Sequence, residues 1–137
     1  MRAVAVLLGL ILAMTVAPPS GAQNASTPAK ELFGKASTPA ALQPEAIGFY
    51  ARGCLAGAQA LPIDGPAWQA MRLSRNRNWG HPRLVALIER LATEAQRYDG
   101  WPGLLVGDMS QPRGSPMQEG HARPQVGLAA YMSHPAL

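Results

Sequence analysis

Cysteine, histidine and aromatic residues are all scarce in this chain of 137 residues. One cysteine and three histidines are present, and aromatic residues make up 6% of the sequence. A single cysteine excludes a framework of internal disulfides, and three histidines leave little material for a metal site, which needs three or four ligands at fixed spacing. Charged residues amount to 15% and form no runs, which argues against a nucleic-acid-binding protein.

Only one long apolar run is present, and it lies at the N-terminus. Arg2 precedes the 15 residues Ala3–Ala17, two prolines follow, and Ser20–Ala22 then offers a small-x-small cleavage site before Gln23. A membrane-spanning helix needs about 20 apolar residues, so the run is short for an anchor. The layout predicts a cleavable secretory signal peptide over residues 1–22, with no stable membrane insertion after cleavage.

Removal of the signal peptide would leave a small basic chain. About 115 residues (137 minus 22) remain, enough for one small domain. Loss of Arg2 leaves eleven basic residues (12 minus 1) against eight acidic ones, an excess that suits the anionic polymers of a cell envelope. Residues 23–46 are rich in Ala, Ser, Thr and Pro and are predicted to form a flexible leader.

An α+β domain is predicted over residues 47–137. Glycines divide Ile47–Ala60 into extended segments and tight turns. Trp68–Trp79 fits either a short helix or a strand pair that carries three arginines. Pro82 suits the first position of a helix that runs to Tyr98. The apolar stripe of this helix is expected to face the core and consists of Leu84, Leu87, Ile88, Leu91, Ala92 and Ala95.

A short strand and a long loop follow the predicted helix. Gly103–Gly107 is apolar and bounded by glycines, which is typical of a buried strand, and a loop is expected over residues 107–120. Asp108 begins this loop, either as an acid–base group or as a turn-forming residue. Glu119 and His121 would share one face of a strand, but two ligands do not make a metal site, and no Ser/His/Asp or Cys/His arrangement is evident.

Several short stretches between Gly48 and Leu128 form an ordered set of motifs. They are Gly53–Ala58, Leu61–Pro62, Met71–Arg72 with Arg75 and Arg77, Gly80–Pro82, the helix that follows, Leu105–Met109 and Gly120–Ala122. In this order and spacing they resemble the penicillin-insensitive murein endopeptidase family, periplasmic zinc metallopeptidases that cut peptide cross-links in peptidoglycan. The resemblance implies the fold shared by lysostaphin-type, D-Ala-D-Ala and hedgehog-type peptidases, of which residues 47–137 would be a truncated N-terminal portion.

The resemblance also implies a zinc site that this sequence does not retain. The family's metal motif is Gly-His-Ala-Ser-His-Gln-x-Gly-Leu-Asp-x-Asp, and His121 matches its first histidine, an accessory metal position. Zinc is held in the family by the second histidine, the last aspartate and a later His-x-His. Pro124 and Tyr131 stand at the first two of these positions. The chain is therefore expected to have lost its catalytic zinc ligands and to be inactive.

Single-base changes account for the residues that differ from the family's metal motif. The family residues replaced by Pro124, Ala129 and Tyr131 are each one base away in the genetic code. Residues up to Leu137 contain no His-x-His, and His134 stands alone. These changes are consistent either with a decayed gene or with errors near the 3′ end of the nucleotide sequence.

The resemblance implies further roles and a location. Cys54 corresponds to a family cysteine whose C-terminal partner is missing here, so it is expected to be half of a lost disulfide, a loss of roughly 2–5 kcal/mol. Arg72, Arg75 and Arg77 would either bind muropeptides or form a solvated face. The signal peptide and the resemblance together predict a periplasmic protein that meets peptidoglycan, with the oligomeric state left open. The alternatives to a metalloendopeptidase are a non-catalytic peptidoglycan-binding fragment and a decayed remnant.

Overall fold

The computed structural model describes residues 27–119 and 124–134. The predicted signal peptide and His121 lie outside these ranges. In chain order the elements are α1 (Ala29–Gly34), β1 (Glu45–Phe49), β2 (Arg52–Ala56), β3 (Gln59–Ala60), β4 (Trp68–Ala70), the 3₁₀ helix η1 (Leu73–Arg75), β5 (Trp79–Gly80), α2 (Pro82–Asp99), β6 (Leu104–Val106), the 3₁₀ helix η2 (Pro124–Val126) and β7 (Met132–Ser133). None of the helices in the described ranges is both long and apolar enough to cross a membrane.

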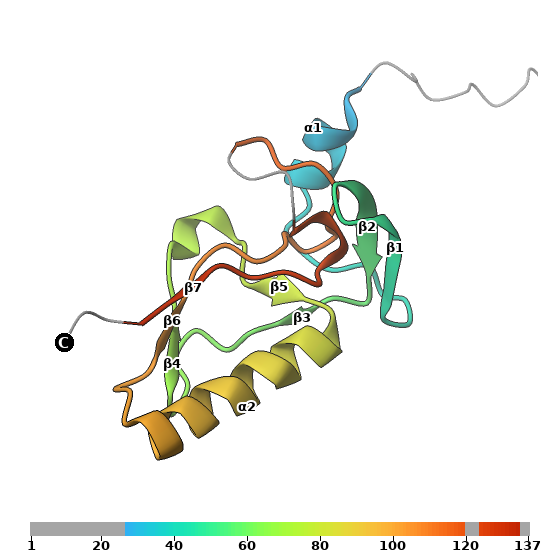
Figure 1. The fold of residues 1–137 in the computed structure, drawn as a ribbon. Coiled ribbons are helices and arrows are strands. Elements are labelled where there is room, and N and C mark those ends of the chain that lie inside the picture. The colour runs from blue at the N-terminus through green and yellow to red at the C-terminus, as the bar shows by residue number, and fades with distance from the viewer. Residues whose placement is uncertain (1–26, 120–123, 135–137) are drawn as a thin grey trace, which may run out of the picture.

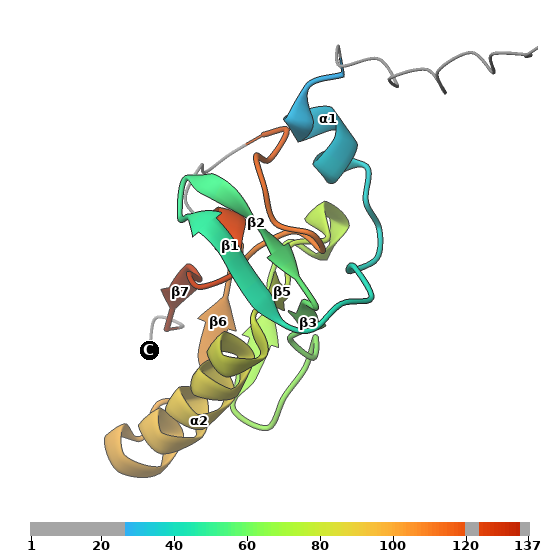
Figure 2. The ribbon, with the colours of Figure 1, turned by 90° about the vertical axis from the view of Figure 1, so that its right-hand side faces the viewer.

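Three small sheets and helix α2 make up the domain (Figures 1 and 2). β1 and β2 form an antiparallel hairpin, and β3 pairs with β5. In the third sheet β6 lies between β4, which is parallel to it, and β7, which is antiparallel. Helix α2 runs along one side of the strands, whereas α1 lies at the other end of the molecule. This mixture confirms the predicted α+β class.

Helix α2 forms where the sequence predicts it, because both of its ends are well defined. Pro82 occupies the first helical position, and the Nδ1 atom of His81 accepts a hydrogen bond of 3.2 Å from the backbone N–H of Arg83. At the other end Gly100 adopts a left-handed conformation with φ of 68°, which a residue with a Cβ adopts only at a steric cost.

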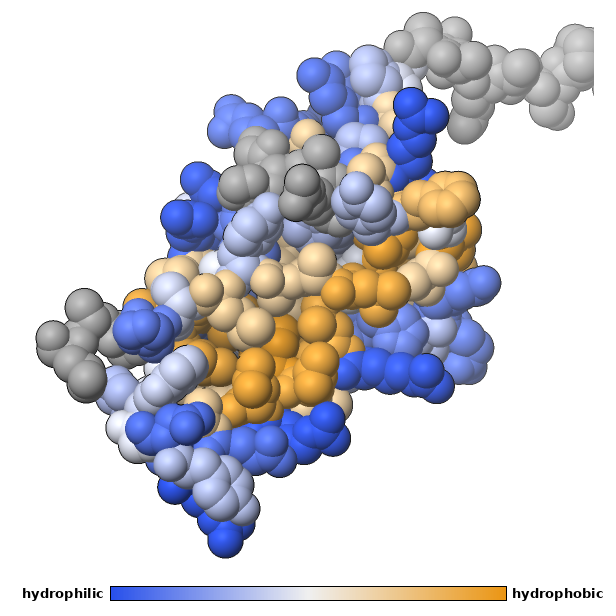
Figure 3. Space-filling model, in the orientation of Figure 1, coloured by the Kyte–Doolittle hydropathy of each residue, from blue (hydrophilic) through white to orange (hydrophobic). Residues whose placement is uncertain are grey.

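The buried face of α2 differs from the predicted stripe. Val85, Ile88 and Ala92 are buried in the core, but Leu87 and Leu91 are 47% and 41% exposed. The prediction was wrong for these two leucines because the apolar side of α2 is wider than the surface that packs on it. The partners in this core are Leu61, Ala67, Leu104, Val106 and Met109. Figure 3 shows apolar surface on the face between α2 and the C-terminal segment.

The structure confirms some of the other predicted segments and contradicts others. The extended segments of Ile47–Ala60 and the strand within Gly103–Gly107 are confirmed. Neither interpretation of Trp68–Trp79 is correct. β4 and β5 join different sheets, and a 3₁₀ helix lies between them. The predicted leader contains α1, and β1 begins two residues before Ile47.

Substitutions on α2 test this assignment of the core. Ile88→Ala is expected to lower the free energy of unfolding by about 2–5 kcal/mol, because it leaves a cavity in a packed core. Leu91→Ala removes a side chain that is partly exposed and is expected to cost less than about 1.5 kcal/mol. Urea denaturation followed by circular dichroism measures both values, and equal losses would contradict the assignment.

Candidate functional site

Strand β6 leads directly to a buried carboxylate. The chain leaves the sheet at Gly107, whose backbone N–H donates to the carbonyl oxygen of Tyr131 at 2.7 Å. Asp108 follows, with only 1% of its surface exposed. The backbone N–H of Met109 then donates to the carbonyl oxygen of Arg77 at 2.7 Å. These bonds hold the start of the loop against the segment that contains the arginines.

Three arginines lie around this carboxylate, and we call Arg72, Arg75, Arg77 and Asp108 the arginine cluster. Arg75 and Arg77 both donate to Oδ2 of the aspartate, at 2.8 and 3.0 Å. The Nη1 atom of Arg72 lies 3.9 Å from Oδ1. The Arg77 side chain is 9% exposed, whereas those of Arg72 and Arg75 are about half exposed. Three positive charges around one negative charge leave a net charge of +2.

The backbone between β4 and β5 brings the arginines to one point. Arg72 and Asn76 flank the 3₁₀ helix η1, and both adopt left-handed conformations, with φ of 56° and 49°. Such conformations are uncommon for residues other than glycine, and here they stand at both ends of the 3₁₀ helix that carries Arg75. Backbone strain of this kind often marks functional segments, and here it belongs to the turn that presents the cluster.

Electrostatics keep Asp108 ionised. Burial of the carboxylate raises its pKa, but the hydrogen bonds from Arg77 and Arg75 and their positive charges lower it by more. The net result is a pKa below the ordinary value of an aspartate. The lowered pKa favours the ionised form of Asp108 at neutral pH, and its carboxylate orients the two guanidinium groups of Arg75 and Arg77.

The cluster borders two hollows in the surface. Arg72 contributes to one of about 270 Å³, lined by Met71, Gly107, Tyr131, Met132 and Ser133 as well. Arg75 and Arg77 contribute to another of about 390 Å³, which we call the polar hollow. Its other lining residues are Gly34, Ser74, Asn76, Gln111, Gln118 and Glu119.

The cluster is suited to binding anions. An arginine offers five N–H donors in a planar fork that matches a carboxylate or phosphate. Arg77 uses two of its nitrogens on Asp108 and on the carbonyl oxygen of Glu119, whereas the half-exposed Arg72 and Arg75 face solvent. The alternative of a purely solvated face is wrong for Arg75 and Arg77, since both bind a buried carboxylate.

The positions that the resemblance links to zinc carry no suitable ligand set. Pro124 is buried at the start of η2 and has no side-chain donor atom. Tyr131 is partly exposed, and its backbone N–H donates to the carbonyl oxygen of Asp108 at 3.2 Å. Within residues 27–119 and 124–134, no three His, Cys, Asp or Glu side chains lie close enough together to hold a metal ion. These residues do not fit the implied zinc.

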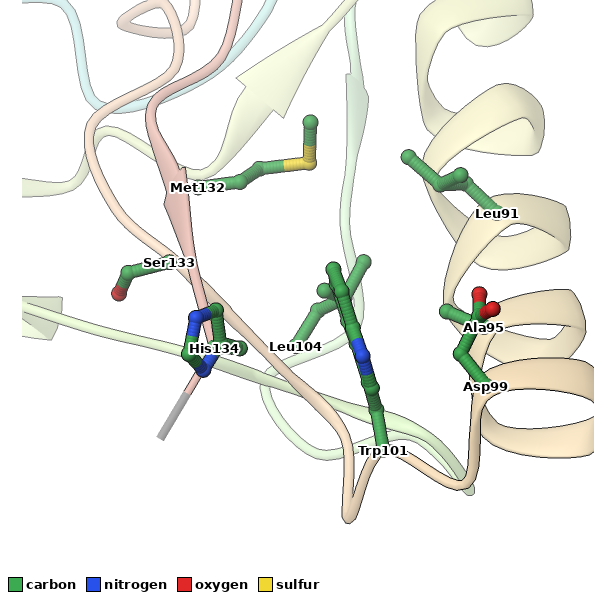
Figure 4. Close-up of a pocket in the computed structure, with 8 residues that line it drawn as sticks. All are labelled: Leu91, Ala95, Asp99, Trp101, Leu104, Met132, Ser133 and His134. Carbon is green, nitrogen blue, oxygen red and sulfur yellow. The ribbon is translucent and has the colours of Figure 1, made fainter. Parts of the chain in front are cut away.

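The remaining sequence candidates lie apart from the cluster in different elements. Cys54 is a half-buried free thiol in β2. His134 follows β7, and its ring centroid lies 5.3 Å from that of Trp101. Figure 4 shows these two rings at a mainly apolar hollow of about 310 Å³, whose other lining residues are Leu91, Ala95, Asp99, Leu104, Met132 and Ser133.

All four members of the arginine cluster can be picked out from the sequence, but no sequence pattern shows that they lie close together in space. In the sequence Asp108 stands out by its place after a strand and the arginines by their charge, but 31 to 36 residues separate the aspartate from the arginines. The residues of the polar hollow outside the cluster were missed altogether, except Glu119. Amides such as those of Gln111 and Gln118 give no pattern that would have distinguished them from other surface residues.

Comparisons with known proteins point to one family. Residues 46–134 match the sequence model described as penicillin-insensitive murein endopeptidase. Proteins of that name from Haemophilus influenzae, Pectobacterium atrosepticum and Klebsiella pneumoniae are 42%, 41% and 36% identical to the chain. The alignments cover 84%, 89% and 86% of this chain and 37%, 42% and 41% of the relatives. The chain thus spans about two fifths of the length of the curated relatives it matches.

Proposed function

Because the chain belongs to the penicillin-insensitive murein endopeptidase family, we propose that it binds the cross-linked peptides of peptidoglycan in the periplasm without hydrolysing them. The predicted signal peptide supports export, and the names of the relatives support peptidoglycan as the polymer. We further propose that its α+β domain has the fold of the hedgehog-type and D-Ala-D-Ala peptidases.

The arginine cluster is the observation that carries the binding proposal. Peptidoglycan peptides carry free carboxylates, and two half-exposed guanidinium groups beside a net charge of +2 attract such groups. Asp108 fixes the position of Arg75, so part of the side-chain entropy lost on binding is already lost in the free protein. The exposed N–H donors of Arg72 and Arg75 would bind the peptide carboxylates.

The absence of hydrolysis in this proposal rests on the residues at the ligand positions. Zinc in a peptidase polarises the scissile carbonyl and lowers the pKa of a bound water, and it needs imidazole, carboxylate or thiolate ligands. Pro124 supplies no side-chain ligand atom, and a phenol such as that of Tyr131 is a poor ligand. These substitutions, rather than the length of the chain, lead us to expect no turnover.

Zinc content and cleavage test this part of the proposal together. We expect the purified secreted chain, dialysed against micromolar zinc, to hold far less than one zinc ion per chain by elemental analysis. A cross-linked muropeptide dimer is expected to remain intact by chromatography, while the Haemophilus influenzae relative serves as the positive control. Stoichiometric zinc together with release of monomers would show that the chain is an active endopeptidase.

A further inference from the structure

Helix α2 and strand β7 leave an apolar face uncovered. Leu87 and Leu91 lie four residues apart on one side of α2, and together with Trp101 and Met132 they are 39% to 47% exposed. Figure 4 shows the side chains of Leu91 and Met132 pointing toward one another across the hollow of about 310 Å³. Apolar surface covers this side of the molecule in Figure 3. An exposed apolar face of this kind marks an interaction site.

Strand β7 also presents an unpaired edge. In the order β4-β6-β7 it is the outermost strand, and no described strand lies beyond it. The backbone N–H of Tyr131 donates to the carbonyl oxygen of Asp108 at 3.2 Å, and its carbonyl oxygen accepts from the N–H of Gly107 at 2.7 Å. Because backbone groups alternate in direction along a strand, those of Met132 point away from β6. Such an edge is suited to pairing with another strand.

A second copy of the chain complements the edge and the apolar face together. When two β7 strands pair antiparallel about a two-fold axis at Met132, the N–H and C=O groups of each Met132 bond to those of the other. The sheet then continues across the axis in the order β4-β6-β7-β7-β6-β4. An axis perpendicular to the sheet keeps both α2 helices on the same side, so the apolar faces of the two copies adjoin.

The charges at the two ends of β7 favour this antiparallel arrangement. Arg72 lines a hollow with Met132 and Ser133 at the end where β7 begins, and Asp99 lines another with the same two residues at the end where β7 terminates. A two-fold axis places the start of one β7 beside the end of the other, so that Arg72 of each copy approaches Asp99 of the second copy. Parallel strands would instead bring like charges together. Charges at the rim of an interface set its orientation more than its affinity.

We propose that the chain forms a two-fold symmetric dimer through the edge of β7 and the apolar side of α2. The four exposed apolar side chains present on the order of 350 Å² per copy. Two copies bury about twice this area, and the β7 backbone and the rim bring the total toward the roughly 1,000 Å² that a specific interface needs. An interface of this size suits a weak dimer with a dissociation constant on the order of 10 μM. It uses neither Arg75 nor Arg77, so the dimer does not depend on the proposed function.

Sedimentation velocity of the full secreted chain, over about 1–200 μM, tests the dimer. We expect a shift from monomer to dimer as the concentration rises. Leu91→Gln should raise the dissociation constant at least tenfold, and so should Met132→Pro, which removes the outward N–H without removing a bond to β6. Ile63→Gln is the matched control and should change the constant less than twofold. Ile63 is 48% exposed, but it adjoins β4 at the opposite edge of the sheet, where its carbonyl oxygen accepts from the N–H of Ala70.

A pair of cysteine variants tests the register of the interface. Opposite residues in a hydrogen-bonded antiparallel pair have Cα atoms about 5.5 Å apart, which is within the range of a disulfide. Met132→Cys is therefore expected to give a covalent dimer on oxidation, whereas Ile63→Cys, which retains Cys54 as well, should give none beyond the level of the original chain. A chain that stays monomeric at every concentration would overturn the proposal, whether this face stays bare or binds another partner. A dimer that survives Leu91→Gln and Met132→Pro, with no cross-link at residue 132, would also overturn it.

Discussion

Replacing Asp108 with asparagine is expected to lower the free energy of unfolding by about 3–5 kcal/mol, since the change leaves the buried Arg77 without its counter-charge. The side chain keeps its size, so the loss would come from charge rather than from a cavity. Thermal and urea denaturation of the purified chain measure it. Asp99→Asn replaces an exposed carboxylate and is the matched control, with a change expected within about 0.5 kcal/mol.

The same substitution has a signature in the pH dependence of stability. Because the pKa of Asp108 is lower in the folded chain than in the unfolded chain, the ionised carboxylate stabilises the fold above the unfolded-state pKa of about 3.9. This stabilisation is lost as the pH falls from there towards the lower pKa of the folded state. The Asp108→Asn variant should lack that acid-induced loss. An unchanged stability at neutral pH would contradict the role given to this carboxylate.

The double variant Arg72→Gln/Arg75→Gln is expected to weaken binding to peptidoglycan sacculi by roughly 10- to 100-fold, since each arginine supplies a charge-assisted hydrogen bond. Both side chains are about half exposed, so the fold should survive, and Arg77 still pairs with Asp108. Co-sedimentation at increasing protein concentration measures the change in affinity.

Two further variants separate geometry from charge. Arg83→Gln/Arg90→Gln removes the same charge from the exposed surface of α2, and its binding should stay within about twofold of the original. Arg72→Lys/Arg75→Lys keeps the charge but loses the planar fork, and it should restore only part of the affinity. Equal losses in the two glutamine variants would show that binding follows overall charge rather than the arginine cluster.

The fold was predictable where local signals were strong. Pro82 and Gly100 mark the ends of α2, and glycines frame β6, so both elements follow from short-range chemistry. The exposure of the Leu87 and Leu91 side chains was not predictable. The periodicity of apolar residues identifies a helix, but it does not show how wide a surface packs against that helix. Asparagine adopts the left-handed conformation more readily than most residues, so Asn76 carries a weak signal for it, but Arg72 carries none.

The individual residues of the candidate site were predictable from the sequence, but their proximity in the fold was not. The arginines approach Asp108 because β4 and β6 pair in parallel, and the chain continues from the same end of both strands. That pairing joins residues more than 30 positions apart, which no local pattern encodes. The residues at the positions that the resemblance links to zinc, in contrast, can be named from the sequence alone, since they depend on residue identity rather than on geometry.

Incubation of the secreted chain with purified sacculi tests the central claim most directly. After sedimentation, the protein in the pellet is measured, and the sacculi are digested with a muramidase to measure the fraction of cross-linked muropeptides. We predict that the chain sediments with the sacculi in a salt-sensitive way and that the cross-linked fraction equals that of sacculi without protein. A fall in that fraction, or a chain that stays in the supernatant at low salt, would contradict binding without hydrolysis.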